Sequence, residues 1–574
     1  MLEEFRTASG LLQVALERYI NASFALRDGY SYRNTINSAE EIRDFVANEM
    51  GLITSYKSGL TQAQVAINQA RNSLANVPIN ALPAEVLTYI FHLVSAEQPC
   101  TFQTPHYWDD DAPVDFPKYP DMLAHVCSQW RQVALASHAL WSHIDIALSC
   151  PLTFGLYERA KTYATRARQI PMDIHIVDPG HFREAEKPDN SGSSEFDFTD
   201  NRPPNEYEMW EELMYEINPD DFDFLSLNVA SRIRTLGLLV HHQYHPIHSR
   251  ALEHCLANCL PGDLSELNVC VPGGSYSFPM FIKPGSLSRY STDVALSEQQ
   301  LERAWESVTT LRLKGRYPIW TSTAYHGLTH LQLEGSCRIS GSELISFLKS
   351  NPQLRVIRCD LRIKETPPSG ANLSPVILNE LEIIDLVNAK EEDAKNFLQW
   401  VTTGSNPLQL SLCCNPTSTV LKDFLARSNV RELRVRSKSR WSYDNLPLAK
   451  FYLPLRLRVL AVDEWENNSP SQHNPIRHFH SSRTEAQFPL DLDALYMLSC
   501  CYEDFEHFRD FVGKCSPQRL ILGNCTVARM DSRIPVDLTL LESETGGDLS
   551  QLSPSVEVLT ASDPSPFPDW NRSY

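Results

Sequence analysis

The chain has 574 residues, too many for one compact core, and its 42% hydrophobic content supports folded domains and excludes global disorder. Its 51 basic and 71 acidic residues give a formal net charge of −20, which disfavours nucleic acid and membrane surfaces as partners. The 14 cysteines show no disulfide framework and the start, MLEEFRTASG, has no secretory pattern, so we expect an intracellular protein, cytoplasmic or nuclear.

Residues 1–76 are predicted to form an amphipathic helical segment. Apolar residues recur there every seven positions, at Val46, Ile53, Leu60, Ile67 and Leu74, with Ile42, Tyr56, Ala63 and Ala70 at the second heptad offset. A dimerising coiled coil and a helix packed against the following domain both fit this stripe. The small or polar residues at the second offset favour packing.

Residues 77–148 contain three short helices with a shared apolar core, interrupted by an acidic insert at 96–121. The first helix opens at Leu82-Pro83, where proline suits the first helical position. Its apolar face comprises Val86, Leu87, Ile90, Phe91 and Val94; the second comprises Leu123, Val126, Cys127, Trp130, Val133 and Ala134; the third comprises Leu140, Trp141 and Ile144. So much apolar surface on a small unit predicts a binding partner.

The region 149–232 is interpreted as a connection that carries a long flexible loop. Its stretch after Asp178 is rich in proline, serine and acidic residues, which is typical of an exposed excursion.

From residue 233 to the end, a strand pattern of apolar-x-x-apolar-x-apolar repeats. Its copies are Ile233/Leu236/Leu238, Leu264/Leu267/Val269, Val308/Leu311/Leu313, Leu328/Leu331/Leu333, Leu354/Ile357/Cys359, Leu381/Ile384/Leu386, Val430/Leu433/Val435, Leu457/Leu460/Val462 and Leu495/Leu498/Cys500. The long gap between 381 and 430 leaves room for a shifted copy at Leu408/Leu410/Leu412. Helical runs lie between several of them, each opening with polar residues suited to capping. The region resembles leucine-rich repeats, which implies an irregular α/β solenoid of stacked strand–helix units.

The helical block at 77–148 resembles an F-box. The motif LP-x-E-[VIL]-L-x-x-I, then V-C-x-x-W-[RK], then L-W is present in order. The resemblance implies adaptor contacts by Leu82, Pro83, Glu85, Val86, Leu87, Ile90, Val126, Cys127, Trp130 and Trp141. An F-box followed by leucine-rich repeats is similar to the F-box substrate receptors of fungi.

This resemblance implies a non-catalytic substrate receptor in an SCF-type (Skp–cullin–F-box) ubiquitin ligase. Its partners would be a Skp-type adaptor, through it a cullin, and a protein target bound by the repeats. The alternative is an F-box scaffold that acts outside a ligase. The sequence contains no P-loop, GxGxxG, HExxH, GxSxG or CxxC motif, so no enzyme and no cofactor is predicted.

Charged residues between the buried strand positions are the candidates for target binding. These are Arg312, Lys314, Arg358, Arg434 and Arg436, of which Arg434 and Arg436 suit an acidic or phosphorylated segment. A metal site is not predicted. The histidines of HHQYHPIH, at 241–248, have helical spacing, but Pro246 argues against one continuous helix.

Overall fold

The computed structural model describes residues 2–31, 39–74, 79, 82–97, 118–148, 153–178, 232–241, 244–257, 259–271, 280–285, 293–335, 338–360, 362–364, 375–386, 389–413, 419–436, 453–454, 456–463, 491–502, 505–528, 535–537 and 552–559. The chain divides into two compact units. One comprises Met1–Leu87 and Cys127–Gln129, and the other comprises Thr88–Val126 and Trp130–Tyr574. Most of the acidic insert and the expected loop after Asp178 lie outside the described residues.

The first unit contains two long helices, α1 (Leu2–Ser31) and α2 (Ala39–Leu74). Tyr19 of α1 joins them, because its hydroxyl donates a hydrogen bond to the Glu49 carboxylate at 2.7 Å. The ring of Tyr19 also meets the ring of Tyr56 edge to face, with 6.3 Å between centroids. Aromatic pairs of this geometry stabilise a contact beyond the area that they bury.

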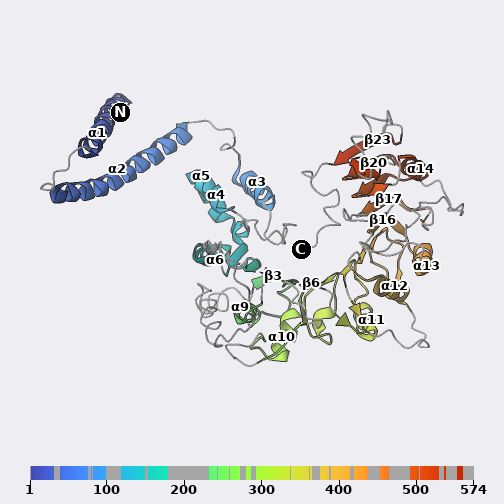
Figure 1. Cartoon of the computed structure of the whole chain (residues 1–574). Coiled ribbons are helices and arrows are strands. Elements are labelled where there is room, and N and C mark those ends of the chain that lie inside the picture. Colours follow the sequence, from blue (N-terminus) through green and yellow to red (C-terminus); the bar gives the residue numbers. More distant parts are fainter. Residues whose placement is uncertain are drawn as a thin grey trace, which may run out of the picture. The chain divides into compact units, whose positions relative to one another are not determined.

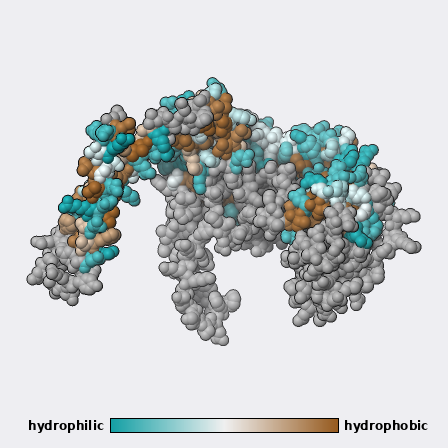
Figure 2. Space-filling view, turned by 90° about the horizontal axis from the view of Figure 1, so that it is seen from above, coloured by the Kyte–Doolittle hydropathy of each residue, from teal (hydrophilic) through white to brown (hydrophobic). Residues whose placement is uncertain are grey.

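The heptad stripe on α2 stays open to solvent. Its described side chains at Val46, Ile53, Leu60 and Ile67 are 42–48% exposed. Figure 2 shows hydrophobic residues beside hydrophilic ones on the surface of these helices. Packing against the following domain and the dimerising coiled coil both stay predictions.

The second unit is a mixed α/β structure. Its helical elements, with α3 beginning in the first unit, are α3 (Ala84–Ala96), α4 (Asp121–His125), α5 (Ser128–Ala136), η4 (His138–Trp141), α6 (Thr153–Ala167), α9 (Pro246–Leu256), α10 (Glu298–Trp305), η7 (Thr323–Tyr325), α11 (Gly341–Ser350), α12 (Glu391–Trp400), α13 (Thr419–Arg427) and α14 (Phe505–Cys515). Among the described residues, no helix combines the length and hydrophobicity needed to span a bilayer.

One parallel sheet of 14 strands organises the second unit. In spatial order its strands are β1 (His143–Ala147), β2 (Met172–Asp178), β3 (Ile233–Val240), β4 (Glu266–Cys270), β6 (Thr310–Lys314), β8 (His330–Glu334), β10 (Val356–Cys359), β13 (Ile383–Leu386), β15 (Leu408–Leu412), β16 (Val430–Arg436), β17 (Val459–Asp463), β18 (Ala494–Leu498), β20 (Arg519–Gly523) and β23 (Ser555–Leu559).

Short strands form four small accessory sheets beside the main one. They are β5 (Met280–Ile282), β7 (Arg316–Pro318), β9 (Arg338–Ile339), β11 (Arg362–Ile363), β12 (Val376–Leu378), β14 (Val401–Thr403), β19 (Cys501–Tyr502), β21 (Thr526–Ala528) and β22 (Pro535–Asp537).

The strand order follows the chain order without a reversal. Crossovers between parallel strands are right-handed, so connections that always advance in the same direction pass over the same face of the sheet. Figure 1 shows α9 to α13 following one another along the same side of the strands. The described helices therefore leave the opposite face of the sheet uncovered.

Alternating side chains set the register of this sheet. Leu311 and Leu313 of β6 pair with Leu331 and Leu333 of β8, and all four are at most 2% exposed. Fully burying each such side chain contributes about 1.5–3 kcal/mol. The residues between them point to the uncovered face, because neighbouring side chains of a strand alternate. A shift of one residue would exchange the two sets, so the pattern fixes the register.

The predicted strands from Ile233 to Leu457 are confirmed, but four further strands were missed. These are β1, β2, β20 and β23. In β2, β20 and β23 the first position of the apolar pattern holds Pro171, Pro517 and Ser553. In β1, Trp141, Ile144 and Ile146 fit the pattern, but Trp141 and Ile144 were expected in the third helix. The sheet consequently starts at His143, within the segment 77–148, and not at residue 233, where the repeats were expected to start.

The predicted copy at Leu495/Leu498/Cys500 is wrong in register. Ladder pairing joins Leu460 to Leu495 and Val462 to Met497, so the true copy is Leu492/Leu495/Met497. All three of these side chains are fully buried, whereas Leu498 is only half-buried. The pattern allowed both registers because leucine stands three residues before and three residues after Leu495.

Neighbouring repeats are joined by a buried asparagine at the end of α11. The amide nitrogen of Asn351 donates to the carbonyl oxygens of Tyr325 at 2.7 Å and Phe347 at 2.6 Å. Its amide oxygen accepts a hydrogen bond from the Leu328 backbone at 2.6 Å. Asn351 is fully buried, so it replaces water for three backbone groups that would otherwise be left without partners.

We expect Asn351→Ala to lower the free energy of unfolding by roughly 2–4 kcal/mol, because it leaves buried backbone groups without hydrogen-bond partners. Urea unfolding followed by circular dichroism measures the change. The neighbouring Gln353 is exposed, so Gln353→Ala is the matched control and should change stability by less than about 0.5 kcal/mol. Equal effects of the two substitutions would contradict the role given to Asn351.

Candidate interaction surfaces

Helix α3 is apolar on two sides. Leu87 and Phe91, one turn apart, are fully buried. Val86, Tyr89 and Leu93 lie at i, i+3 and i+7 on another stripe and are 42–65% exposed. A helix that is hydrophobic on more than its core-facing side is typical of one that is covered by a partner.

Within the second unit, α3 packs on α5 through aromatic and polar contacts. The rings of Phe91 and Trp130 lie 4.9 Å apart at an interplanar angle of 51°. The Ser137 hydroxyl and the His92 Nε2 atom are hydrogen-bonded at 3.3 Å. Trp130 is half-buried by this packing, which leaves part of its ring accessible.

Trp141 belongs to the core and not to the outer surface. Its indole nitrogen donates to the Ala134 carbonyl at 2.8 Å, and its ring meets Tyr163 edge to face at 5.0 Å. The Arg166 guanidinium covers the ring at 4.2 Å. Trp141 is therefore fully buried between α5 and α6, and its expected adaptor contact is corrected to an internal one.

The other predicted adaptor residues differ in exposure. Pro83, Glu85, Val86 and Val126 are exposed; Leu82, Ile90, Cys127 and Trp130 are half-buried; Leu87, like Trp141, is buried. The ten residues therefore divide between the core and the surface of these short helices. Leu87 is therefore also corrected to a core residue.

Sequence reasoning passed over four exposed apolar residues in the same block. These are Tyr89, Leu93, Met122 and Leu135. The spacing of Tyr89 and Leu93 from Val86 was the available signal, because it places all three on one stripe of α3. The family landmarks drew attention to other positions.

On the uncovered face of the sheet, the ladder aligns one polar residue from each central strand. This central row comprises Asn268, Arg312, Gln332, Arg358, Asp385, Ser411 and Arg434. The predicted target-binding residues Arg312, Arg358 and Arg434 thus share one row. Lys314 and Arg436 lie two residues further along their strands, on the same face.

Charges on this face are paired across the strands. Arg312 forms an ion pair with Glu266. The Lys314 ammonium lies 3.9 Å from the Glu334 carboxylate, which also accepts a hydrogen bond from Gln332 at 2.6 Å. Burial raises the pKa of Glu334, although Lys314 opposes the change. The face therefore presents mixed charge and not a field of one sign.

Arg434 is corrected as a target-binding residue. It is only 4% exposed and forms an ion pair with Asp463 of the next strand. The buried guanidinium of Arg434 cannot also bind a phosphate, because its donors would have to leave the buried Asp463 carboxylate. Arg436 is half-buried on the same strand.

His245 and His248 of HHQYHPIH cap the start of α9. The His248 ring accepts a hydrogen bond from the His245 backbone at 2.8 Å, and its other nitrogen lies 2.7 Å from the Asp178 carboxylate. Pro246 occupies the first turn of this helix, as its fixed backbone angle suits. Within the described residues, these histidines form no group of three converging ligands.

No protein family model and no curated protein matches this chain. Among solved structures, the chain is similar to one described as the crystal structure of the Rad7 and Elc1 complex in yeast, with a TM-score of 0.29 and 11% identity. The match covers 93% of this chain and 97% of that chain. A TM-score this low decides neither fold nor function.

We expect Arg434→Met to lower the free energy of unfolding by roughly 3–5 kcal/mol, because it leaves the buried Asp463 carboxylate without its counter-ion. Denaturant unfolding measures the loss. The double variant Arg434→Met/Asp463→Leu should recover most of the stability, since both charges are removed together. A double variant as unstable as the single one would show that the pair is not the cause.

Proposed function

We propose that the chain is the substrate-recognition subunit of an SCF-type ubiquitin ligase. Helices α3–α5 bind a Skp-type adaptor, which brings a cullin, and the uncovered face of the sheet binds a protein target. The exposed apolar side chains on α3–α5, in a segment with the ordered F-box landmarks, are the observation that carries this proposal.

An apolar partner surface explains the composition of the block. Val86, Tyr89 and Leu93 on α3, and Met122 and Val126 at α4, stay exposed although each is large. Burial stabilises by about 25 cal/mol for each Å² of apolar surface, and aromatic anchors such as Tyr89 often dominate interface energies. A polar ligand would not gain this stabilisation, because it would not bury the apolar side chains in an apolar surface.

The target is expected to be a folded or extended polypeptide with charges of both signs. Paired charges such as Arg312 with Glu266 and Lys314 with Glu334 can exchange partners with a protein surface without leaving one ion alone. The row is also long, because it crosses neighbouring parallel strands. A small apolar molecule would neither pair with these charges nor span the row.

The mechanism is recruitment and not bond chemistry. Holding a target lysine near a charged ubiquitin-conjugating enzyme replaces a bimolecular encounter by an effectively intramolecular one. In this role the chain transfers no group itself, and it needs no cofactor.

Adaptor binding by the full-length chain tests the proposal. We expect Val86→Glu/Val126→Glu to weaken binding to a Skp-type adaptor on the order of 100-fold or more, because two charges would have to be desolvated in an apolar interface. Both side chains are exposed in the free chain, so the melting temperature should not fall. Biolayer interferometry and circular dichroism give the two readouts.

The matched control is Ile377→Glu, at an apolar residue of β12 that is 62% exposed and lies outside the helical block. It should leave adaptor binding unchanged. No adaptor binding by the wild type, or equal binding by all three proteins, would overturn the docking surface. Adaptor binding without a cullin in the same reconstituted complex would favour the scaffold function instead.

A further inference from the structure

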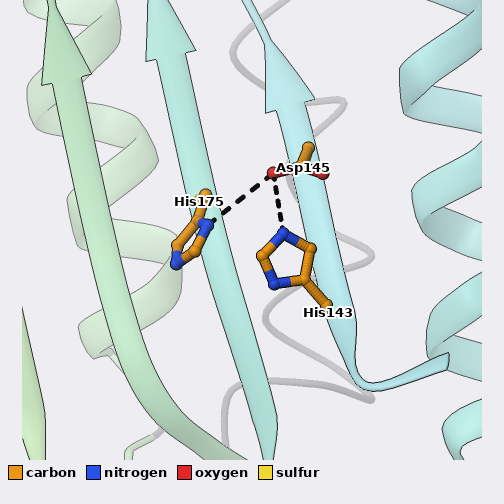
Figure 3. Close-up of side chains that lie close together, drawn as sticks. All are labelled: His143, Asp145 and His175. Atoms are coloured by element: carbon orange, nitrogen blue, oxygen red, sulfur yellow. Dashed lines mark ion pairs between the residues drawn. The ribbon is translucent and has the colours of Figure 1, made fainter. Parts of the chain in front are cut away.

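The first two strands of the sheet bring three metal-ligating side chains together. His143 and Asp145 are two residues apart on β1, so they point to the same face. His175 on β2 is the ladder partner of Asp145. Figure 3 shows the two rings converging on the Asp145 carboxylate from neighbouring strands.

The distances within this group fit a shared ion. One Asp145 oxygen, Oδ1, lies 3.2 Å from His143 Nε2 and 3.7 Å from His175 Nδ1. The three potential ligand atoms lie within 4.8 Å of one another. In a tetrahedral zinc site with bonds of about 2.0–2.1 Å, neighbouring ligand atoms are roughly 3.3 Å apart. The two distances from Asp145 to the imidazole nitrogens are already close to this value.

The site is enclosed on one side and reachable on the other. The side chains of Asp145 and His175 are 1% and 11% exposed, whereas that of His143 is 34% exposed.

Arg159 of α6 orients the carboxylate from behind. Its guanidinium lies 3.6 Å from the second Asp145 oxygen, Oδ2, which leaves Oδ1 directed at the two rings. Such outer contacts fix the geometry of first-shell ligands. The positive charge of Arg159 also opposes a bound cation, so the affinity should be lower than that of a closed four-ligand site.

We propose that His143, Asp145 and His175 form a site for one divalent transition metal ion, with Zn²⁺ the best fit. Two imidazole nitrogens and one carboxylate oxygen are ligands that Zn²⁺ accepts, and three protein ligands leave its fourth position open. The ion would tie β1 to β2, with the partly exposed His143 as its most accessible ligand. Hard cations such as Mg²⁺ prefer oxygen ligands and should not compete.

Zinc titration of the full-length chain after chelator treatment tests the site. We expect one Zn²⁺ per chain and a Zn²⁺-dependent rise in melting temperature, with no rise in Mg²⁺. His143→Gln and His175→Gln should each weaken Zn²⁺ binding by at least about tenfold and abolish the thermal shift, because two ligands hold the ion poorly. His330→Gln is the matched control and should bind as the wild type does, since His330 aligns with His143 along the ladder on the same face.

A gain-of-affinity variant separates the site from a folding defect. We expect Arg159→Gln to bind Zn²⁺ severalfold more tightly, because it removes the opposing charge, and a misfolded chain would not gain affinity. Zn²⁺ binding that survives both His143→Gln and His175→Gln would place the ion elsewhere. A wild type that binds less than one Zn²⁺ would show that Asp145 pairs only with the two histidines, and either result would overturn the proposal.

Discussion

Each central strand places two aliphatic side chains on one face of the sheet, and across the strands these form two rows. The burial of these two rows governs the structure of the second unit. A single strand–helix unit cannot remove both rows from water, so every unit depends on its neighbours. Leu311 and Leu313 are buried only because α/β units stand on both sides of β6. The requirement is the same at each strand, and repetition therefore produces one continuous parallel sheet.

The uncovered face follows from the same constraint. Because the crossovers advance in one direction, the described helices collect on the apolar face. On the other face polar side chains pack against one another, and Gln332, Ser411 and Arg434 are buried there. Side chains there are spaced by the ladder, which brings opposite charges such as Arg434 and Asp463 into contact across strands. These lateral pairs neutralise a row that is otherwise rich in arginine, and they explain why the face does not attract one kind of charge.

The helical block before the sheet has apolar side chains both in its core and on its surface. Its short helices bury Leu87, Phe91 and Trp141 for their own stability, and they still expose Val86 and Val126. Trp141 connects the helical block to the sheet. Its side chain contacts α5 and α6, and β1 begins two residues later. The same helices thus carry an exposed apolar surface and, through Trp141, the attachment to the sheet.

The sequence by itself determined the strand–helix class and the register of the strands from Ile233 to Leu457, because these depend on local periodicity of apolar residues. It failed where the first position of the pattern holds Pro171, Pro517 or Ser553, and where Trp141 and Ile144 were expected in a helix. It also failed where leucines three residues on either side of Leu495 allowed two registers. Only the tertiary structure decided which apolar residues of the helical block are buried, which arginines are held by carboxylates of the next strand, and that His143, Asp145 and His175 meet. These properties depend on which residues face one another across strands that are distant in the sequence. The spacing of residues along the chain carries no information about that pairing.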